Sequence, residues 1–534
     1  MEVTFLTDHP TSKMSNVKDI GEHIVARVQE LVGMPTPWHR ALWNVGLCLR
    51  LDELLEASEC LAQGMLSEQT LERMVSACKR VVGEDLAVTP SERSVICGAL
   101  KSIPRHRGVD FQCLRDMQRR LSDQYLLRLA TTFKDRPAVD LEQAASAIAS
   151  FLLDASHSEE ALHSWFKARR TDVRNGMSLS DLCEAAHHEL AATGNRTFLV
   201  LVAFGRAPKM ADGYPAEWLG KSEVASWLHG NKSSTTGLRI EGGLVLTLQA
   251  KDSHAAARQA IALTDGYESR HVIATGHSIA PLKSVWVEGI AEPFSHTSHQ
   301  RGVRVKVLYR HNQIFQSSQM GSVDAAMELL AHLEGQSPAA AVAGGWAAIE
   351  ALLGEPNNRS SAAENLAYLV ACSLPRSELT ALSYTIEKCW KDQAERFKGL
   401  DANKDRAQVV ISCLINDQAR GLPSLSDNAA ISRMRALLAN PNKRLHQLHS
   451  DICDAFLRLY RQRNLVLHGG MTTSVSLAST LRTVSKLAGA GIDRVAHAHY
   501  VQGIKPLELV GRAKVSMSLV DGSDPYACIS LLER

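Results

Sequence analysis

Apolar positions recur at helical spacing along two long stretches of the chain, separated by a shorter stretch with the pattern of strands. From about 16 to 192, and again from about 322, hydrophobic residues return every three or four positions, which is the period of an amphipathic helix. Ser67, and either Ser178 or Ser180, stand where helix N-caps are expected, and Gly64 and Gly194 stand where helices would end. The pattern predicts a mainly α-helical protein.

The stretch from about 195 to 318 has a different texture. The run RTFLVLVAF (196–204) is short and rich in β-branched and aromatic residues, which is typical of a buried strand. Further strand candidates are LRIEGGLVLTLQA, HVIATG, SVWVEGIAEPF and VRVKVLYRH, and the helix candidate SHAAARQAIALTD lies among them. We therefore expect a central α+β region with one mixed or antiparallel sheet.

These changes of pattern predict four parts. They are a helical N-terminal region (1–194), an α+β domain (195–320), a helical domain (321–500) and a less regular C-terminal tail (501–534). We find no internal repeat and no low-complexity segment.

Composition narrows the function only slightly. The net charge of +2 permits a nucleic-acid partner without requiring one. The eleven cysteines are scattered and form no C-x-x-C pair, which predicts reduced thiols rather than a zinc or redox motif. The N-terminus has no apolar signal core, and no apolar run approaches the roughly 18 residues of a membrane span. We expect a cytoplasmic protein that has no membrane partner.

Two short motifs that suggest cofactors are incomplete. In GYPAEWLGKS, six residues rather than four separate Gly213 from Gly220, so a phosphate-binding P-loop is not predicted and a turn into a helix is. His296 and His299 are three apart, but no carboxylate or cysteine cluster completes a metal site, and a polar loop is favoured. We predict neither a metal nor a cofactor.

A basic pattern marks the last strand candidate. If VRVKVLYRH is a strand, Arg304, Lys306 and Arg310 share one face and the valines share the other. A basic strand face can follow an RNA backbone, and it can equally be a solvated edge that deters aggregation. Both interpretations stay open.

The segment LYRQRNLVLHGG (459–470) ends a long helix and carries the most informative residues. On an ideal helix, Arg463 falls in the middle of one apolar stripe, which is formed by Ile452, Phe456, Leu459, Val466 and Leu467. A charge in such a place needs partners. Arg461, Asn464 and His468 fall within about 60° of one another, away from that stripe. Arg and His also favour helix C-termini, because they complement the helix dipole, but this does not account for Arg463.

The sequence RNLVLHG resembles the R-x(4–6)-H signature of HEPN domains, in which Asn often follows the Arg. Arg463-Asn464 and His468 fit with four intervening residues, and Arg461 to His468 would fit with six. Upstream, GGWAAIEALLG (344–354) resembles the W-x-A-L-E-x-L helix of Apea-like HEPN proteins, with Ile349 in place of Leu. The resemblance covers about 330–500 and implies a C-terminal HEPN-like helical bundle. The first 320 residues resemble no family that we can name.

The resemblance implies a chemistry. Many HEPN proteins are metal-independent ribonucleases that act as toxins in bacterial anti-phage defence, including abortive infection. The RNA 2′-OH attacks the adjacent phosphorus, which leaves a 2′,3′-cyclic phosphate and a 5′-OH. His468 would then be the general base or acid, Arg463 would stabilise negative charge, and Asn464 would position the phosphate or the histidine. Glu350 matches the family's helix glutamate and would pair with Arg463 or tune His468, and Arg461 is a candidate RNA contact.

The resemblance also implies partners. Arg463 and His468 are about 140° apart on an ideal helix, so one helix is not expected to aim both at one phosphate. In the family, two copies of this helix meet across a dimer, and we therefore predict a homodimer through the HEPN-like domain, or two HEPN sites within a larger assembly. The expected substrate is RNA, with tRNA among the candidates, and residues 1–320 would sense a phage-derived trigger or regulate the nuclease.

Other interpretations stay open. The chain could be a non-catalytic HEPN dimerisation or RNA-binding scaffold that works with a separate partner. A nucleotide-driven enzyme is a weaker alternative, because the P-loop spacing fails. Arg444 and His449 repeat the spacing of the motif without its Asn, which we take as coincidence.

Overall fold

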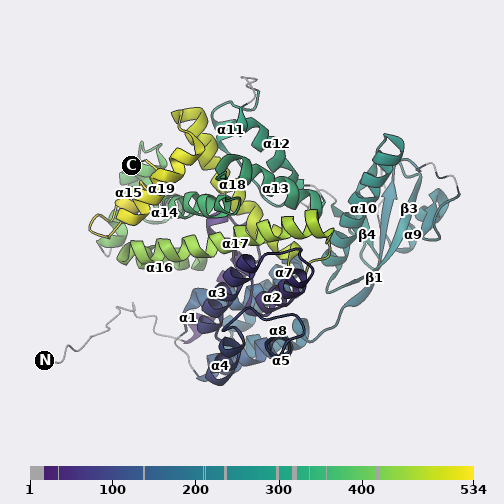
Figure 1. Cartoon of the computed structure of the whole chain (residues 1–534), viewed down its shortest axis with the longest axis horizontal. Coiled ribbons are helices and arrows are strands. Elements are labelled where there is room, and N and C mark those ends of the chain that lie inside the picture. Colours follow the sequence, from purple (N-terminus) through teal and green to yellow (C-terminus); the bar gives the residue numbers. More distant parts are fainter. Residues whose placement is uncertain are drawn as a thin grey trace.

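The chain folds into two helical bodies and a sheet domain that lies to one side of them (Figure 1). The computed structural model describes residues 17–33, 35–135, 139–208, 210, 212–233, 237–295, 300–315, 321–335, 337–356, 358–416 and 420–533. The predicted class, mainly α with a central α+β region, is confirmed.

The N-terminal body is a cluster of helices around its own apolar core. Its elements are α1 (Val17–Leu31), η1 (Trp38–Arg40), α2 (Leu47–Ala62), α3 (Glu68–Glu84), α4 (Pro90–Ala99), α5 (Val109–Asp135), α6 (Leu141–Asp154), α7 (Glu159–Arg174), α8 (Leu179–Ala186) and the π-helical turn η2 (His187–Ala191). The predicted caps Ser67 and Ser178 each accept a hydrogen bond from a first-turn backbone N–H of α3 and α8. Gly64 follows α2 with φ of 74°, a conformation that glycine adopts at little cost.

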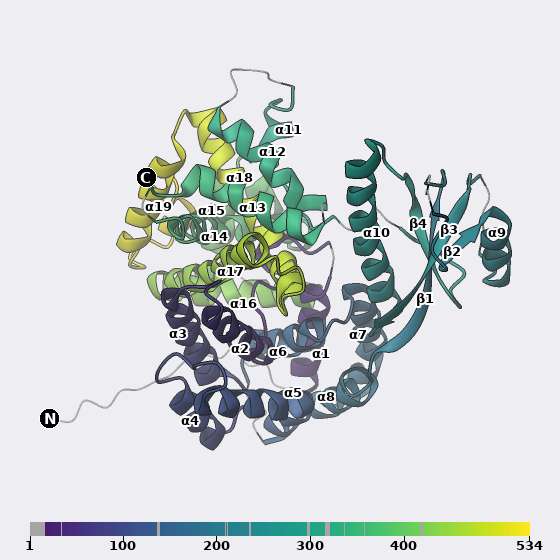
Figure 2. The ribbon, with the colours of Figure 1, turned by 45° about the vertical axis from the view of Figure 1, so that its right-hand side comes forward.

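The sheet domain contains five antiparallel strands in the order β2-β3-β1-β4-β5. Its elements are β1 (Arg196–Phe204), β2 (Trp218–Gly220), α9 (Lys221–Gly230), β3 (Gly242–Ala250), α10 (Ser253–Thr275), β4 (Pro281–Val287) and β5 (Phe294–Ser295). Alternate β1 residues face opposite sides: Val200 and Val202 pack under α10, whereas Leu201 packs under α9. Figure 2 shows α10 between the sheet and the helical bodies, with α9 on the far side. The GKS segment leads into α9, as predicted.

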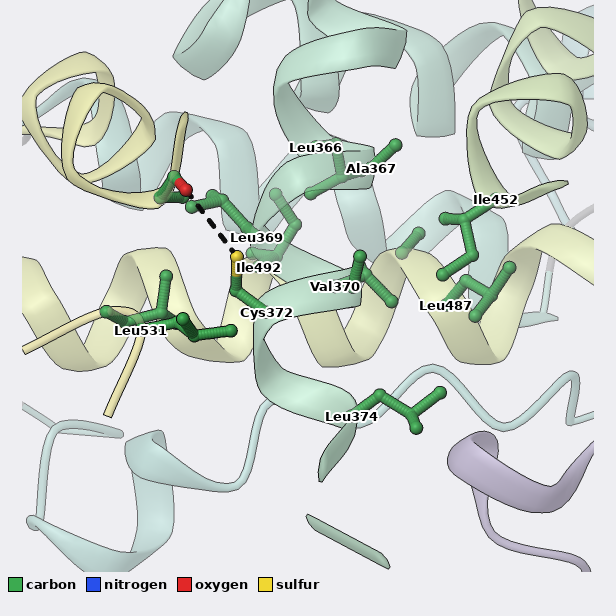
Figure 3. Close-up of a cluster of buried hydrophobic side chains, with 14 of the residues drawn as sticks. Leu366, Ala367, Leu369, Val370, Cys372, Leu374, Ile452, Leu487, Ile492 and Leu531 are labelled. Carbon is green, nitrogen blue, oxygen red and sulfur yellow. Dashed lines mark hydrogen bonds between the residues drawn. The ribbon is translucent and has the colours of Figure 1, made fainter. Parts of the chain in front are cut away.

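The C-terminal bundle is built around α14 (Ser361–Cys389), a long and mostly buried helix. Its elements are α11 (Val307–Arg310), α12 (Ser322–Gly335), α13 (Pro338–Leu353), α14 (Ser361–Cys389), η4 (Ala394–Phe397), α15 (Asn403–Ile415), α16 (Leu425–Ala439), α17 (Pro441–Gly469), α18 (Leu477–Gln502), α19 (Pro506–Leu519) and η5 (Ala527–Ile529). Leu366 and Val370 of α14 lie among apolar side chains of neighbouring helices, including Ile452 of α17 and Ile492 of α18 (Figure 3). This core holds α17 by its apolar side.

Two strand predictions are wrong. HVIATG is the end of α10, where Val272 and Ile273 are exposed, so β-branched residues did not decide the local structure. In VRVKVLYRH (303–311), the first four residues form no strand and residues 307–310 form the short helix α11. The backbone N–H of Val303 donates to a Glu334 carboxylate oxygen and that of Val307 donates to Asp493, so no strand ladder forms.

The predicted common face of Arg304, Lys306 and Arg310 therefore does not exist. Arg304 pairs with Glu334 of α12, and Arg310 belongs to α11. The end of the chain is also more regular than expected, because 506–519 forms α19, and Leu531 is buried against the bundle core.

Charged side chains join the two helical bodies. Glu378 of α14 is fully buried and receives His39 and Arg40 from the N-terminal body and Arg433 from α16. Burial raises the pKa of this carboxyl, but these partners outweigh burial and hold the pKa well below its usual range.

The eleven cysteines all lie in the described part and are free thiols, as predicted. No helix among the described residues is long and apolar enough to cross a membrane.

We expect Gly491→Ala to destabilise the bundle. A Cβ at Gly491 in α18 would lie 2.3 Å from Leu366 Cδ1 and 2.9 Å from Val370 Cγ2, so these buried side chains, or the two helices themselves, would have to shift. Overpacking of this kind costs about 1–3 kcal/mol of unfolding free energy, measurable by chemical denaturation. The matched control is Gly511→Ala in α19, where a Cβ meets nothing within 4 Å and should stabilise by roughly 0.5–1 kcal/mol. Equal effects of the two substitutions would contradict the described packing.

Candidate active site

The end of α17 presents the predicted motif. Gly470 has φ of 63° and donates its backbone N–H to the carbonyl of Leu465, which is a left-handed C-cap. His468 therefore lies in the last turn, where a histidine complements the negative end of the helix dipole.

Arg463, Asn464 and His468 come together within this single chain. Nη1 of Arg463 donates to Asn464 Oδ1 at 3.0 Å and to His468 Nε2 at 3.2 Å. Although the two residues are about 140° apart on an ideal helix, their side chains meet, because the arginine side chain is long enough to span the step of five residues from 463 to 468, about 7.5 Å of rise. Arginine only donates, so Nε2 of His468 is the unprotonated nitrogen of the imidazole in this arrangement.

The predicted apolar stripe is rotated near this end of α17. Arg463 is half-buried and Leu467 is exposed, whereas Arg461, expected away from the stripe, is buried. The prediction assumed that the helix faces one core. Helix α17 instead packs against α14 on one side and against the N-terminal body on the other, where polar partners make buried charges tolerable.

Glu53 of α2 is the carboxylate partner of two buried arginines of α17. Its Oε1 accepts from Arg458 Nε and from Arg461 Nη2, both at 2.6 Å, and all three side chains are at most 7% exposed. Burial alone raises the pKa of Glu53, but the two guanidinium groups outweigh it and lower the pKa to about 2. Burial lowers the pKa of Arg461, and the attraction of the shared carboxylate does not make up for this. One carboxylate thus serves two cations, and positive charge is left beside the motif.

A cleft of about 630 Å³ lies between α17 and the N-terminal body. One wall is α17, and the opposite wall is the α2–α3 turn with the first turns of α3; the loop before α14 adds a third side. Among the described residues, six arginines and two carboxylates line this cleft: Arg50, Arg73, Arg359, Arg458, Arg461, Arg463, Glu53 and Asp454. Cationic walls of this kind favour an anionic ligand.

Glu350 acts on this cleft indirectly. Its carboxylate accepts from Trp346 Nε1 at 2.6 Å and lies 3.5 Å from Arg359 Nε, and no bond to Arg463 forms. The Trp346 ring lies against Tyr460, with ring centroids 4.8 Å apart, and both Tyr460 and Arg359 line the cleft. Glu350 therefore positions two cleft residues.

The other predicted residues lie outside the cleft. Arg304, Lys306 and Arg310 are not among its lining residues. His296 and His299 lie outside the described residues. Arg444 is exposed and bonds to Gln447, while the His449 ring packs 3.9 Å from that of Tyr368, so these two do not form a second site.

Sequence reasoning missed Arg50, Glu53 and Arg73. A signal was present for Arg50 and Glu53, because both are charges embedded in the apolar run LCLRLDELL. No such signal marks Arg73, which is an exposed residue of an ordinary amphipathic helix. Arg73 becomes a cleft residue only because α17 and the loop before α14 lie across from α3.

Within the described ranges, no group of three or more His, Cys, Asp and Glu side chains is arranged to hold a metal ion. The chain matches no protein-family model, no curated protein and no solved structure. The cleft is therefore interpreted from its own residues.

We expect Glu53→Gln to lower the free energy of unfolding strongly at neutral pH, because it leaves two buried guanidinium groups without their carboxylate. Removing one partner of a buried ion pair costs about 3–5 kcal/mol of unfolding free energy. The depressed pKa of Glu53 means that its stabilisation is present above the unfolded pKa of about 4.3 and is lost as pH falls towards 2. Denaturation curves should therefore show that the difference in unfolding free energy between the wild type and Glu53→Gln decreases as pH falls through this range.

The control is Glu72→Gln, which changes an exposed carboxylate of α3 and should alter stability by no more than about 0.5 kcal/mol. A Glu53→Gln variant as stable as this control at pH 7 would show that the ion pair does not join the two bodies.

Proposed function

We propose that the chain is a metal-independent HEPN-type endoribonuclease, with its active site at Arg463 and His468. The observation that carries the proposal is the 3.2 Å contact of Arg463 Nη1 with His468 Nε2 at the wall of an arginine-rich cleft. The resemblance in the sequence supplies the class, and the cleft supplies a place for an RNA phosphate.

The contact suggests how substrate prepares the histidine. A phosphate is a stronger acceptor for a guanidinium than a neutral imidazole is. When RNA binds, the fork of Arg463 turns to the phosphate, and Nε2 of His468 is freed to accept a proton. Because His468 is exposed, a 2′-OH can reach it.

The reaction then needs only groups of the substrate and the cleft. His468 Nε2 takes the proton of the 2′-OH, the 2′-oxygen bonds to phosphorus, and the bond from phosphorus to the 5′-oxygen breaks. The 5′-oxygen leaves with a proton from solvent in the open cleft. Arg463 stabilises the extra charge on the phosphate oxygens, and Asn464 positions Arg463 through its 3.0 Å hydrogen bond.

The biological setting follows from the same resemblance. We propose a cytoplasmic effector of bacterial anti-phage defence of the abortive-infection type, with RNA as its substrate and tRNA among the candidates. The N-terminal region would regulate it in response to a phage-derived trigger. A homodimer through the HEPN-like bundle stays a prediction.

A non-catalytic RNA-binding scaffold is the second candidate. It is favoured by the structural use of two cleft arginines, because Arg458 and Arg461 are already engaged by Glu53. In this function the cleft would bind RNA without cutting it.

We expect Arg463→Ala and His468→Ala each to reduce RNA cleavage by at least ~10²-fold, the usual loss when a general base or a charge-stabilising group is removed. Purified proteins are incubated with total RNA without divalent metal, and the same variants are expressed in bacteria with and without phage challenge. New 5′-OH ends are then sequenced.

The matched control is His446→Ala, which removes an exposed histidine from the other end of α17. Discrete ends made by the wild type and by this control, but by neither active-site variant, support the nuclease. Identical ends from all four proteins under every condition would reject catalysis by this pair and favour the scaffold.

A further inference from the structure

We propose that the N-terminal body is itself part of the RNA-binding site, with Arg73 of α3 binding a second phosphate of the strand that is cut at Arg463 and His468. This inference rests on the proposed function and deepens it. It assigns to α2 and α3 a direct contact with substrate, beyond any role in sensing.

The wall formed by α2 and α3 is fixed against the motif helix. Leu465 of α17 packs into a small apolar cluster with Leu66 and Leu71 from the α2–α3 turn and α3. The end of α17 approaches this turn closely, since a Cβ at Gly469 would lie 2.4 Å from Met65 Sδ. The two walls therefore pack directly against each other, and α3 lines the same cleft as His468.

Arg73 and Arg463 are the two lining arginines whose positive charge meets only neutral partners. Arg73 Nη1 donates to Ser360 Oγ at 3.0 Å, across the cleft from α3 to the loop before α14. Within the described part of the chain, no carboxylate lies within 4 Å of either guanidinium, whereas the other four lining arginines each have one. Two uncompensated guanidinium groups at separate points of one cleft fit two phosphates of one strand.

Arg50 is a further, nearly buried cation of the same cleft. Its side chain is 7% exposed and lines the same cleft, and its Nε has no hydrogen-bond partner among the described residues. Its carboxylate neighbour is Asp454, 3.7 Å from Nη1, which is beyond hydrogen-bond distance. Its guanidinium therefore adds positive charge to this edge of the cleft.

The site then selects a substrate class. A single RNA strand carries phosphates that can meet both cationic points of the cleft, whereas a mononucleotide would occupy only one of them. Binding should depend on salt, because each phosphate that is neutralised releases condensed counterions.

The test separates binding from cleavage. In the His468→Ala background, which keeps the cleft but lacks the proposed base, a short single-stranded oligoribonucleotide is titrated by fluorescence anisotropy at several salt concentrations. We expect Arg73→Glu to weaken binding by at least ~10-fold and to reduce the slope of log K against log salt by about 1. The control, Arg119→Glu on the exposed surface of α5, makes the same charge change outside the cleft and should weaken binding by less than ~3-fold.

The outcomes distinguish this inference from the proposed function. If the wild type cleaves RNA in a His468-dependent manner but Arg73→Glu binds like Arg119→Glu, the subsite is wrong and the nuclease stands. If the wild type does not cleave but Arg73→Glu still weakens binding selectively, the nuclease fails and the RNA site at α3 stands. Equal binding by both charge variants, or no binding at all, overturns the subsite. Matching thermal unfolding of the two variants confirms that folding is unaffected.

Discussion

Buried carboxylates hold the two helical bodies in register, and Glu53 is the one that lines the cleft. Glu53 of α2 accepts from Arg458 and Arg461 of α17, and these three side chains are almost entirely removed from water. The desolvation of such a group offsets much of its Coulomb attraction, so its main consequence is positional: any docking that separates the partners leaves buried charge unpaired. Glu378 makes a similar connection at another part of the same seam.

The cleft depends on this register. Because α2 and α3 are held against α17, the Arg463–His468 contact opens onto a space with walls from both bodies rather than onto bulk solvent. Sharing one carboxylate between two arginines leaves excess positive charge beneath that space. The ion pair that joins the bodies thus also leaves positive charge in the cleft, and the proposed chemistry uses the neighbouring side chains Arg463 and His468.

Local signals made part of this molecule predictable. Ser67 and Ser178 begin their helices as predicted, and RTFLVLVAF forms β1 over the expected residues, because caps and short apolar runs act through neighbouring backbone. β-Branched residues predicted strands at the end of α10 and in the segment after Gly302. Neither is a strand, because contacts with other parts of the molecule, which a local pattern does not contain, decide the structure there. In the second case the backbone donors bond to Glu334 and Asp493, which lie far along the chain.

The candidate site was predictable in its centre and not in its surroundings. Arg463, Asn464 and His468 are close in sequence, and they are bonded in the structure. Their opposite wall comes from residues about 400 positions earlier, and no periodicity within α17 could indicate it. Arg461 is buried because it packs against that wall, where it pairs with Glu53.

The most direct measurement is a crystal structure of the full chain with a short RNA in which every 2′-OH is methylated, so that it binds without being cut. We expect a phosphate in the cleft bonded to Arg463, with the adjacent 2′-oxygen facing Nε2 of His468. RNA bound at another surface, for example beside Lys306 and Arg310, with the cleft left to solvent, would contradict it.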